Sequence, residues 1–222
     1  MINRDYILRL AEQFGRELSI ILGLRKRNKY EDALIYIDDL LLKNTGLTLR
    51  FADVLSEDAL IEALSPLGHL NVSSCLTTAI LLEAEGDVYE DMGRTNDSYY
   101  RYSKSLYLFL TALPHEPLES CTNFVVGVDG LLDKLADYEL PASLKSKLFP
   151  YYEYIQRYGK AEDTLYELLE DTPHDHTLIE QGRQFYMRLL KQDDIALQTR
   201  DFSHEEAVEG LQSLQQYDQK RF

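Results

Sequence analysis

The sequence has no tryptophan, only two cysteines and no long apolar run. Cys75 and Cys121 belong to no C-x-x-C pair, so we expect reduced core thiols of a cytoplasmic protein rather than a disulfide scaffold. The longest apolar stretch, residues 18–24, is far shorter than the roughly 20 residues of a membrane span. Charges among the first apolar residues also differ from the pattern of a signal peptide. These absences predict a soluble cytoplasmic protein that does not bind to membranes.

Positive charge is also scarce. The chain has 23 Lys and Arg against 38 Asp and Glu, a formal net charge of −15. This excess repels phosphate groups, so we expect no general affinity for nucleic acid or for anionic membranes. It favours a basic protein partner instead. The main basic cluster, residues 25–29, fits a helix C-terminus, where cations interact favourably with unpaired carbonyl groups.

The motifs that identify common enzymes are missing. There is no glycine-rich phosphate loop, no G-x-S-x-G and no H-E-x-x-H. His174, Asp175 and His176, with Asp171 nearby, form the densest group of metal ligands, but histidines two positions apart point in different directions on a helix. We therefore predict no catalytic residues, no metal and no cofactor. A weak metal-binding protein or enzyme that uses His174 and His176 remains an alternative.

The apolar residues recur with a helical period throughout, and no segment alternates as a strand. This predicts an all-α protein. Ser56 is expected to cap a short helix, Pro150 to kink or divide another, and Thr172 to cap a helix that has Pro173 at its first position. A capping box of Ser203 and Glu206 begins the last helix, and the preceding link, residues 193–202, is a candidate flexible segment. The helices are expected near residues 3–27, 29–43, 56–64, 72–112 (a hairpin), 118–138, 141–158, 160–171, from 172 and from 203.

The most informative stretch is residues 82–114. Gly86, Ser98 and Ser105 supply small residues where two helices cross, while Tyr89 and Tyr102 fill the groove beside them. Gly93 follows, where the chain leaves the first helix, and glycine tolerates the left-handed conformation found there. This pattern resembles one tetratricopeptide repeat, a pair of antiparallel helices. Leu82 departs from it, because the repeat usually has tryptophan there, and serines replace its usual alanines.

Two weaker copies flank this unit, at residues 28–41 and 158–173. In the first, Tyr30, Ala33 and Ile37 share one face; in the second, the pattern is carried by Gly159, Leu165 and Leu168. The chain as a whole resembles an uncharacterised bacterial family with a tetratricopeptide-like fold. The resemblance implies antiparallel helix hairpins stacked as a short, irregular superhelix. It supplies an architecture and no activity.

Prolines in residues 113–117 mark the best candidate boundary. We expect an N-terminal helical repeat region, residues 1–114, with its best repeat at residues 82–114. A C-terminal helical region, residues 115–222, contains one degenerate repeat. We expect it to pack on the first region as one elongated unit.

The resemblance also implies which positions face a ligand in the best hairpin. They are Ile80, Glu83, Asp87, Glu90 and Asp91, and four of the five are acidic. An acidic face flanked by Tyr99 and Tyr100 as aromatic anchors suits a basic or amphipathic protein segment. The alternative is a solvated helix face, with the tyrosines in helix–helix seams.

The sequence therefore predicts a non-enzymatic scaffold or adaptor for protein–protein interaction. Its partner is expected to be a protein or peptide of basic character. A structural homodimer is the first alternative, either through the wide apolar stripe of the first helix or by contact of residues 25–29 with the acidic face of a second copy.

Overall fold

The computed structural model describes residues 2–172 and 175–219. These residues form helices joined by turns, with no strand among them, so the predicted all-α fold is confirmed. They divide into two compact units, Met1–Glu139 and Leu140–Phe222. The boundary expected after residue 114 falls inside the first unit. Pro114 and Pro117 interrupt the helix there, but the chain then returns to pack on the same unit as α7 (Thr122–Lys134).

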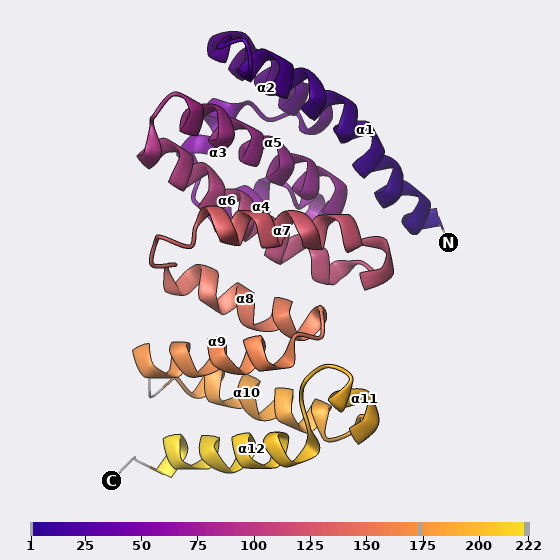
Figure 1. Cartoon of the computed structure of the whole chain (residues 1–222), viewed down its shortest axis with the longest axis vertical. Coiled ribbons are helices and arrows are strands. Elements are labelled where there is room, and N and C mark those ends of the chain that lie inside the picture. The colour runs from indigo at the N-terminus through magenta and orange to yellow at the C-terminus, as the bar shows by residue number, and fades with distance from the viewer. Residues whose placement is uncertain (1, 173–174, 220–222) are drawn as a thin grey trace. The chain divides into compact units, whose positions relative to one another are not determined.

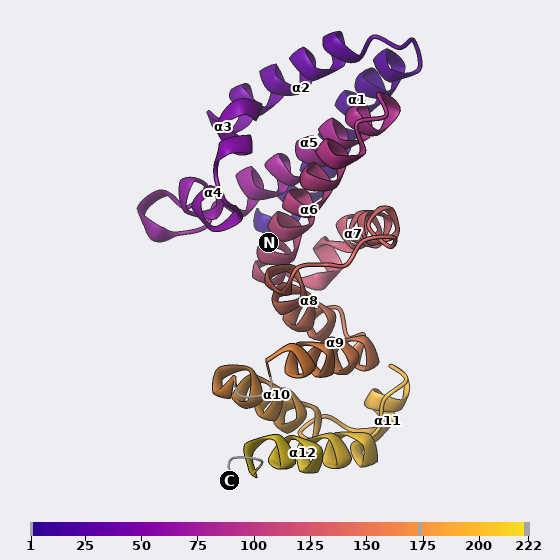
Figure 2. The same cartoon turned by 90° about the vertical axis from the view of Figure 1, so that its left-hand side faces the viewer.

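The first unit is built around a long helix hairpin. Helices α5 (Val72–Asp91) and α6 (Thr95–Ala112) lie side by side along their length, as Figures 1 and 2 show. Helices α1 and α2 pack against α5, whereas α4 and α7 pack against α6. This central position explains why α5 and α6 are buried on most sides. The other helices of the unit are α1 (Ile2–Arg25), α2 (Tyr30–Thr45), α3 (Leu49–Val54) and α4 (Glu57–Ala63).

The crossing of α5 and α6 depends on small residues, as the sequence predicts. A Cβ atom added at Gly86 would lie 2.6 Å from Cε1 of the Tyr102 ring. The Ser105 hydroxyl donates to the Ala79 carbonyl oxygen at 2.7 Å, which places α6 directly against the backbone of α5. Glycine at position 86 is therefore required by a close approach and not by the backbone conformation.

Among the described residues, three helix–helix turns share one geometry. Each has a residue with positive φ (57°, 71° and 61°), followed by a residue with φ between −90° and −94° and ψ between 61° and 71°. The N–H of this second residue donates to the carbonyl five positions earlier, at 2.8–3.0 Å. Four positions later comes a small buried residue, Ala33, Ser98 or Ala161. The turn Asn28–Lys29 begins the first repeat that the sequence predicts, Gly93–Arg94 lies within the second, and Gln156–Arg157 immediately precedes the third.

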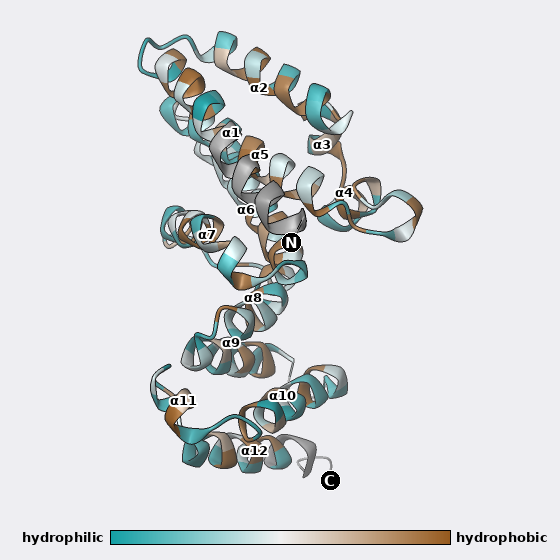
Figure 3. Cartoon of the chain, turned by 90° about the vertical axis from the view of Figure 1, so that its right-hand side faces the viewer, coloured by the Kyte–Doolittle hydropathy of each residue, from teal (hydrophilic) through white to brown (hydrophobic). Residues whose placement is uncertain are grey.

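The second unit pairs α8 (Ala142–Tyr154) with α9 (Tyr158–Asp171), and α10 (His176–Leu189) with α12 (His204–Gln219). Figure 3 shows apolar and polar residues interspersed along α9, α10 and α12, as expected for amphipathic helices. Aromatic rings fill the core of this unit. The rings of Phe149, Tyr158 and Phe202 lie 5.5–6.5 Å from that of Phe185.

Several local predictions for the second unit need correction. Pro150 lies inside α8 without dividing it. Asp175, and not Thr172, caps α10, because its carboxylate accepts from the N–H groups of Thr177 and Leu178; Pro173 lies outside the described residues. The link expected to be flexible contains α11 (Asp194–Gln198) and ends at a buried Phe202.

The caps at Ser56 and Ser203 are confirmed. The Ser56 hydroxyl oxygen accepts from the Ala59 N–H at the start of α4. The Ser203 hydroxyl oxygen accepts from the Glu206 N–H, and the same hydroxyl donates to the Glu206 carboxylate at 2.7 Å.

Candidate functional site

Asp87 on α5 is the centre of an ion-pair network. Its Oδ2 accepts from Nη1 of Arg25, at the end of α1, at 2.7 Å. Its Oδ1 accepts from Nζ of Lys134, at the end of α7, at 2.7 Å, and from the Tyr102 hydroxyl on α6 at 2.9 Å. One carboxylate thus connects three neighbouring helices to α5.

Glu83 and Asp91 extend the network along the same helix. Lys134 Nζ also donates to Glu83 Oε1 at 2.8 Å, and Arg25 Nε donates to Asp91 Oδ2 at 2.7 Å. Burial raises the pKa of the Glu83 carboxyl. Burial alone would lower the pKa of Lys134, but its two carboxylate neighbours raise it. Three of the predicted acidic residues are therefore brought together, and they face two cations of the same chain.

The sequence did not reveal these cations. The predicted ligand-facing positions of the α5–α6 hairpin include no lysine or arginine, as the sequence shows. Arg25 and Lys134 reach the site from outside the hairpin. They are 62 and 47 residues away from Asp87 in the chain. Arg25 belongs to the basic cluster that we assigned to the end of a helix. In the structure this side chain is 18% exposed and contacts the acidic face of its own chain. The face is partly neutralised rather than uniformly negative.

The other predicted residues lie apart from this network. The Glu90 carboxylate accepts from the Ser98 hydroxyl at 2.5 Å, across the α5–α6 turn. The Tyr99 ring lies 4.7 Å from the Tyr138 ring and 5.5 Å from that of Tyr100. Tyr99 is half-buried in this cluster, whereas Tyr100 is 63% exposed. Tyr99 therefore has the character of a seam residue, and Tyr100 is left available to solvent.

A groove of about 230 Å³ lies between α1 and α5, beside the network. Its charged end is formed by Arg25, Glu83 and Asp87. Leu18 and Leu22 of α1 line it and are 36% and 45% exposed. Ile80, the fifth predicted ligand-facing residue, lines the same groove. The arrangement offers an apolar surface that ends at charged groups, which suits contact with an amphipathic partner. The apolar walls are completed by Ile21 and Ala84.

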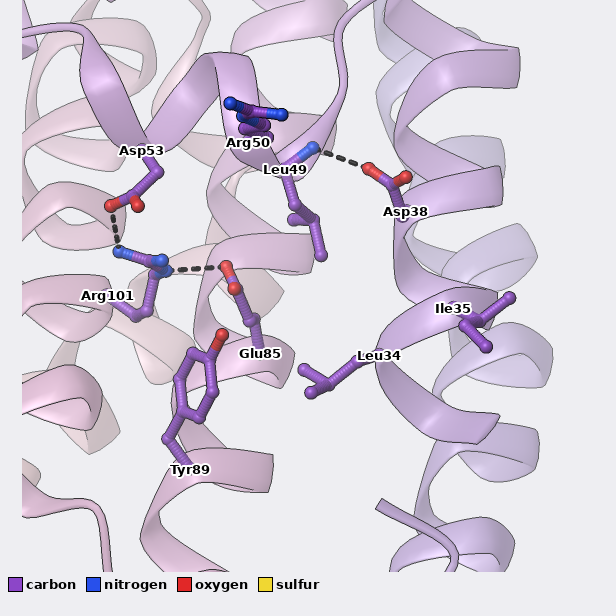
Figure 4. A pocket seen from close by; sticks show the side chains of 9 residues that line it. All are labelled: Leu34, Ile35, Asp38, Leu49, Arg50, Asp53, Glu85, Tyr89 and Arg101. Carbon is purple, nitrogen blue, oxygen red and sulfur yellow. Dashed lines mark hydrogen bonds and ion pairs between the residues drawn. The ribbon is translucent and has the colours of Figure 1, made fainter. Parts of the chain in front are cut away.

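A second cleft, of about 390 Å³, lies between α2, α3 and the α5–α6 hairpin (Figure 4). Arg101 donates from Nε to Glu85 at 2.7 Å and from Nη1 to Asp53 at 2.7 Å. Glu85 is only 2% exposed, and burial raises the pKa of its carboxyl although Arg101 opposes this shift. Across the cleft, Asp38 accepts from the N–H of Leu49, the first residue of α3. The charged groups of this cleft fix α3 to the hairpin.

Lys104 makes a related contact next to this cleft. Its Nζ donates to three backbone carbonyls, those of Ala52, Asp53 and Leu55, at 2.7–3.1 Å. These are carbonyls at the C-terminal end of α3, which a helix leaves without partners of its own. Burial lowers the pKa of Lys104. The sequence held one signal for Glu85, because this charge interrupts an otherwise apolar helix face that includes Leu81, Leu82 and Val88.

The described residues contain no group of three or more side chains that could hold a metal ion. Of the alternative metal ligands, His174 lies outside the described residues, and His176 is exposed at the start of α10. Cys75 and Cys121 are both buried, and burial raises the pKa of Cys75 to about 12. A thiol with that pKa is not a nucleophile at neutral pH. In the part of the chain that the structure describes, no helix has the length and apolar character needed to cross a membrane.

No curated protein and no solved structure shows significant similarity to the chain. One family model does match, and it covers residues 1–219. The chain therefore belongs to that family, which is described as a family of unknown function (DUF6483).

Proposed function

We propose that the protein is a non-enzymatic interaction module that binds a basic amphipathic helical segment of another protein in the groove between α1 and α5. The observation that carries the proposal is the composition of this groove. Leu18 and Leu22 leave apolar surface exposed, and the groove ends at Glu83 and Asp87. A helix with apolar residues on one face and basic residues beside them complements both parts.

The sign of the charge favours a basic partner. At the end of the groove three carboxylates face two cations, Arg25 and Lys134. The excess is negative, as it is for the whole chain at −15. A basic segment is therefore attracted over a distance and needs no rearrangement of the ion pairs to remain bound.

The test uses a fluorescently labelled peptide of leucine and lysine with an amphipathic helical pattern. Its binding is measured by anisotropy beside a scrambled peptide of the same composition and an acidic analogue. We expect the patterned basic peptide to bind about tenfold or more tightly than either control, because only it can bury leucines in the groove while facing the carboxylates.

Variants of α1 locate the site. The double change Leu18→Ser and Leu22→Ser removes the apolar wall without changing charge, and we expect it to weaken binding about tenfold or more. Ile20→Ser is the matched control, because Ile20 is 48% exposed on α1 and does not line the groove. Equal effects of the two variants, or equal binding of the scrambled peptide, would refute the proposal. Loss of self-association in the double variant, measured by sedimentation, would favour the homodimer instead.

A further inference from the structure

The second unit contains a cleft of about 480 Å³ that differs in charge from the rest of the chain. Its walls are the turn between α8 and α9 and the segment after α11. Three of the residues that line it are basic, Arg157, Lys160 and Arg200, and the acidic one is Asp201. In a chain with a net charge of −15, this local excess of positive charge is the reverse of the overall balance.

Two of these cations are not neutralised by the protein. No carboxylate in the described part of the chain forms an ion pair with Lys160 or Arg200. The Lys160 ammonium lies 5.6 Å from the centre of the Tyr152 ring, which attracts it without cancelling its charge. Like charges held around one cleft repel each other, and an anion between them removes that repulsion.

The backbone donors at the start of α9 belong to residues that line the same cleft. Tyr158, Gly159 and Lys160 all line it, and they are the first three residues of α9, whose N-cap residue makes no side-chain hydrogen bond to them. Gly159 has no atom within 4 Å of the position that a Cβ would take, so there is free space on that side of its backbone. These N–H groups add hydrogen bonds of the kind that an oxygen-rich anion accepts.

We propose that this cleft binds the phosphoryl group of a small phosphate monoester. Lys160 and Arg200 outnumber the one carboxylate, Asp201, and Arg and Lys are the residues that recognise phosphoryl groups. The cleft is also large enough for an organic group, since ligand pockets span roughly 300–1,000 Å³. Ile155 and the Tyr158 ring supply apolar surface for that group. This site is independent of the groove between α1 and α5.

The test is an NMR titration of the full-length ¹⁵N-labelled chain with adenosine 5′-monophosphate as the probe. We expect saturable shifts of the Gly159 and Lys160 amide signals, and displacement by inorganic phosphate. Adenosine without its phosphate is expected to bind about tenfold more weakly or worse, because the charged contacts are lost. Equal shifts with adenosine, or no saturable shift with the monophosphate at millimolar concentration, would overturn the proposal.

Charge variants distinguish this cleft from nonspecific attraction. Lys160→Gln and Arg200→Gln are each expected to weaken binding of the monophosphate about tenfold. Lys191→Gln is the matched control, because Lys191 is exposed in the same unit and does not line the cleft. If Lys191→Gln weakens binding as much as the other two changes, the anion is attracted by surface charge in general and the proposed site is wrong.

Discussion

At the residue scale, Gly86 is the glycine of the first unit, among the described residues, that is packed most closely against a neighbour. A methyl group there would meet Tyr102 at 2.6 Å and Cβ of Arg101 at 3.2 Å, and the Tyr102 hydroxyl is held by Asp87. We expect Gly86→Ala to lower the free energy of unfolding by about 1–3 kcal/mol, although alanine favours helix more than glycine does.

Gly127→Ala is the matched control for this change. Gly127 lies in α7 of the same unit, and nothing is within 4 Å of its added Cβ. There the helix preference acts alone, and stability should rise by up to about 1 kcal/mol. Urea unfolding followed by circular dichroism measures both. If Gly86→Ala is as stable as Gly127→Ala, the close crossing of α5 and α6 is not as described.

A half-buried carboxyl in the second unit, that of Glu162, predicts a pH dependence. Burial raises the pKa of Glu162 above its ordinary value of 4.5, and the Tyr186 hydroxyl that donates to it at 2.6 Å only partly opposes this. The folded state therefore holds the proton more tightly than the unfolded state. This contribution to stability is present below pH 4.5 and is lost as pH rises through the raised pKa.

Glu162→Gln keeps the acceptor for Tyr186 and removes the titration. We expect the unfolding free energy of the native protein to fall relative to that of Glu162→Gln as pH rises from 4 to about 7. Chemical denaturation of both proteins across this range gives the difference directly. A difference that does not change with pH, or that changes in the opposite direction, contradicts the raised pKa.

At the element scale, the three equivalent turns predict opposite effects at equivalent positions. Gly93 has φ 71° with no atom near its added Cβ, so only the backbone conformation opposes a side chain. Gly93→Ala should cost about 1–2 kcal/mol. Gln156, at the same place in the α8–α9 turn, already bears that strain at φ 61°, so Gln156→Gly should stabilise by up to about 1 kcal/mol. Thermal unfolding tests both signs, and a shift of the same sign in both variants would show that the turns are not equivalent.

The docking of α3 is predicted to depend on Lys104. Replacing it with methionine leaves the carbonyls of Ala52, Asp53 and Leu55 without this donor. We expect the amides of α3 to exchange hydrogen faster in Lys104→Met, while those of α5 keep their protection. Hydrogen exchange followed by mass spectrometry resolves the two helices. Uniformly faster exchange would indicate general destabilisation instead of local release of α3.

The sequence predicts elements well where a local signal defines them. Helical periodicity located the hairpins, and Ser56 and Ser203 cap helices as expected. Gly93 lies where the chain leaves α5. Pro150 shows the limit of such signals, because tertiary packing can keep a helix continuous across a proline that would break it in isolation.

Long-range contacts explain what the sequence could not show. The positions Ile80, Glu83 and Asp87 were identified and do line one groove. The neutralisation of Glu83 and Asp87 by Arg25 and Lys134 depends on helices far away in the chain, and no spacing within the sequence indicates it. The same holds for α7, whose return to the first unit moves the boundary past the prolines that appear to mark it.

At the scale of the whole molecule, the local charge at two sites differs from the net charge of the chain. The chain is acidic overall at −15, yet cations are held against carboxylates beside the α1–α5 groove, and they gather at the cleft formed by α9. In the proposed function, the negative excess attracts a basic partner, and the groove offers apolar surface against which its apolar face is buried. The proposed function therefore depends most on whether that groove is the contact surface.

Site-specific photo-crosslinking tests this most directly. A benzophenone side chain placed at position 22, in the groove, is compared with one at position 20 on the same helix. After irradiation with the basic amphipathic peptide, we expect a crosslinked product from position 22 and little from position 20. Equal products from both positions, or products from position 20 alone, would contradict the claim that the groove between α1 and α5 is where a partner binds.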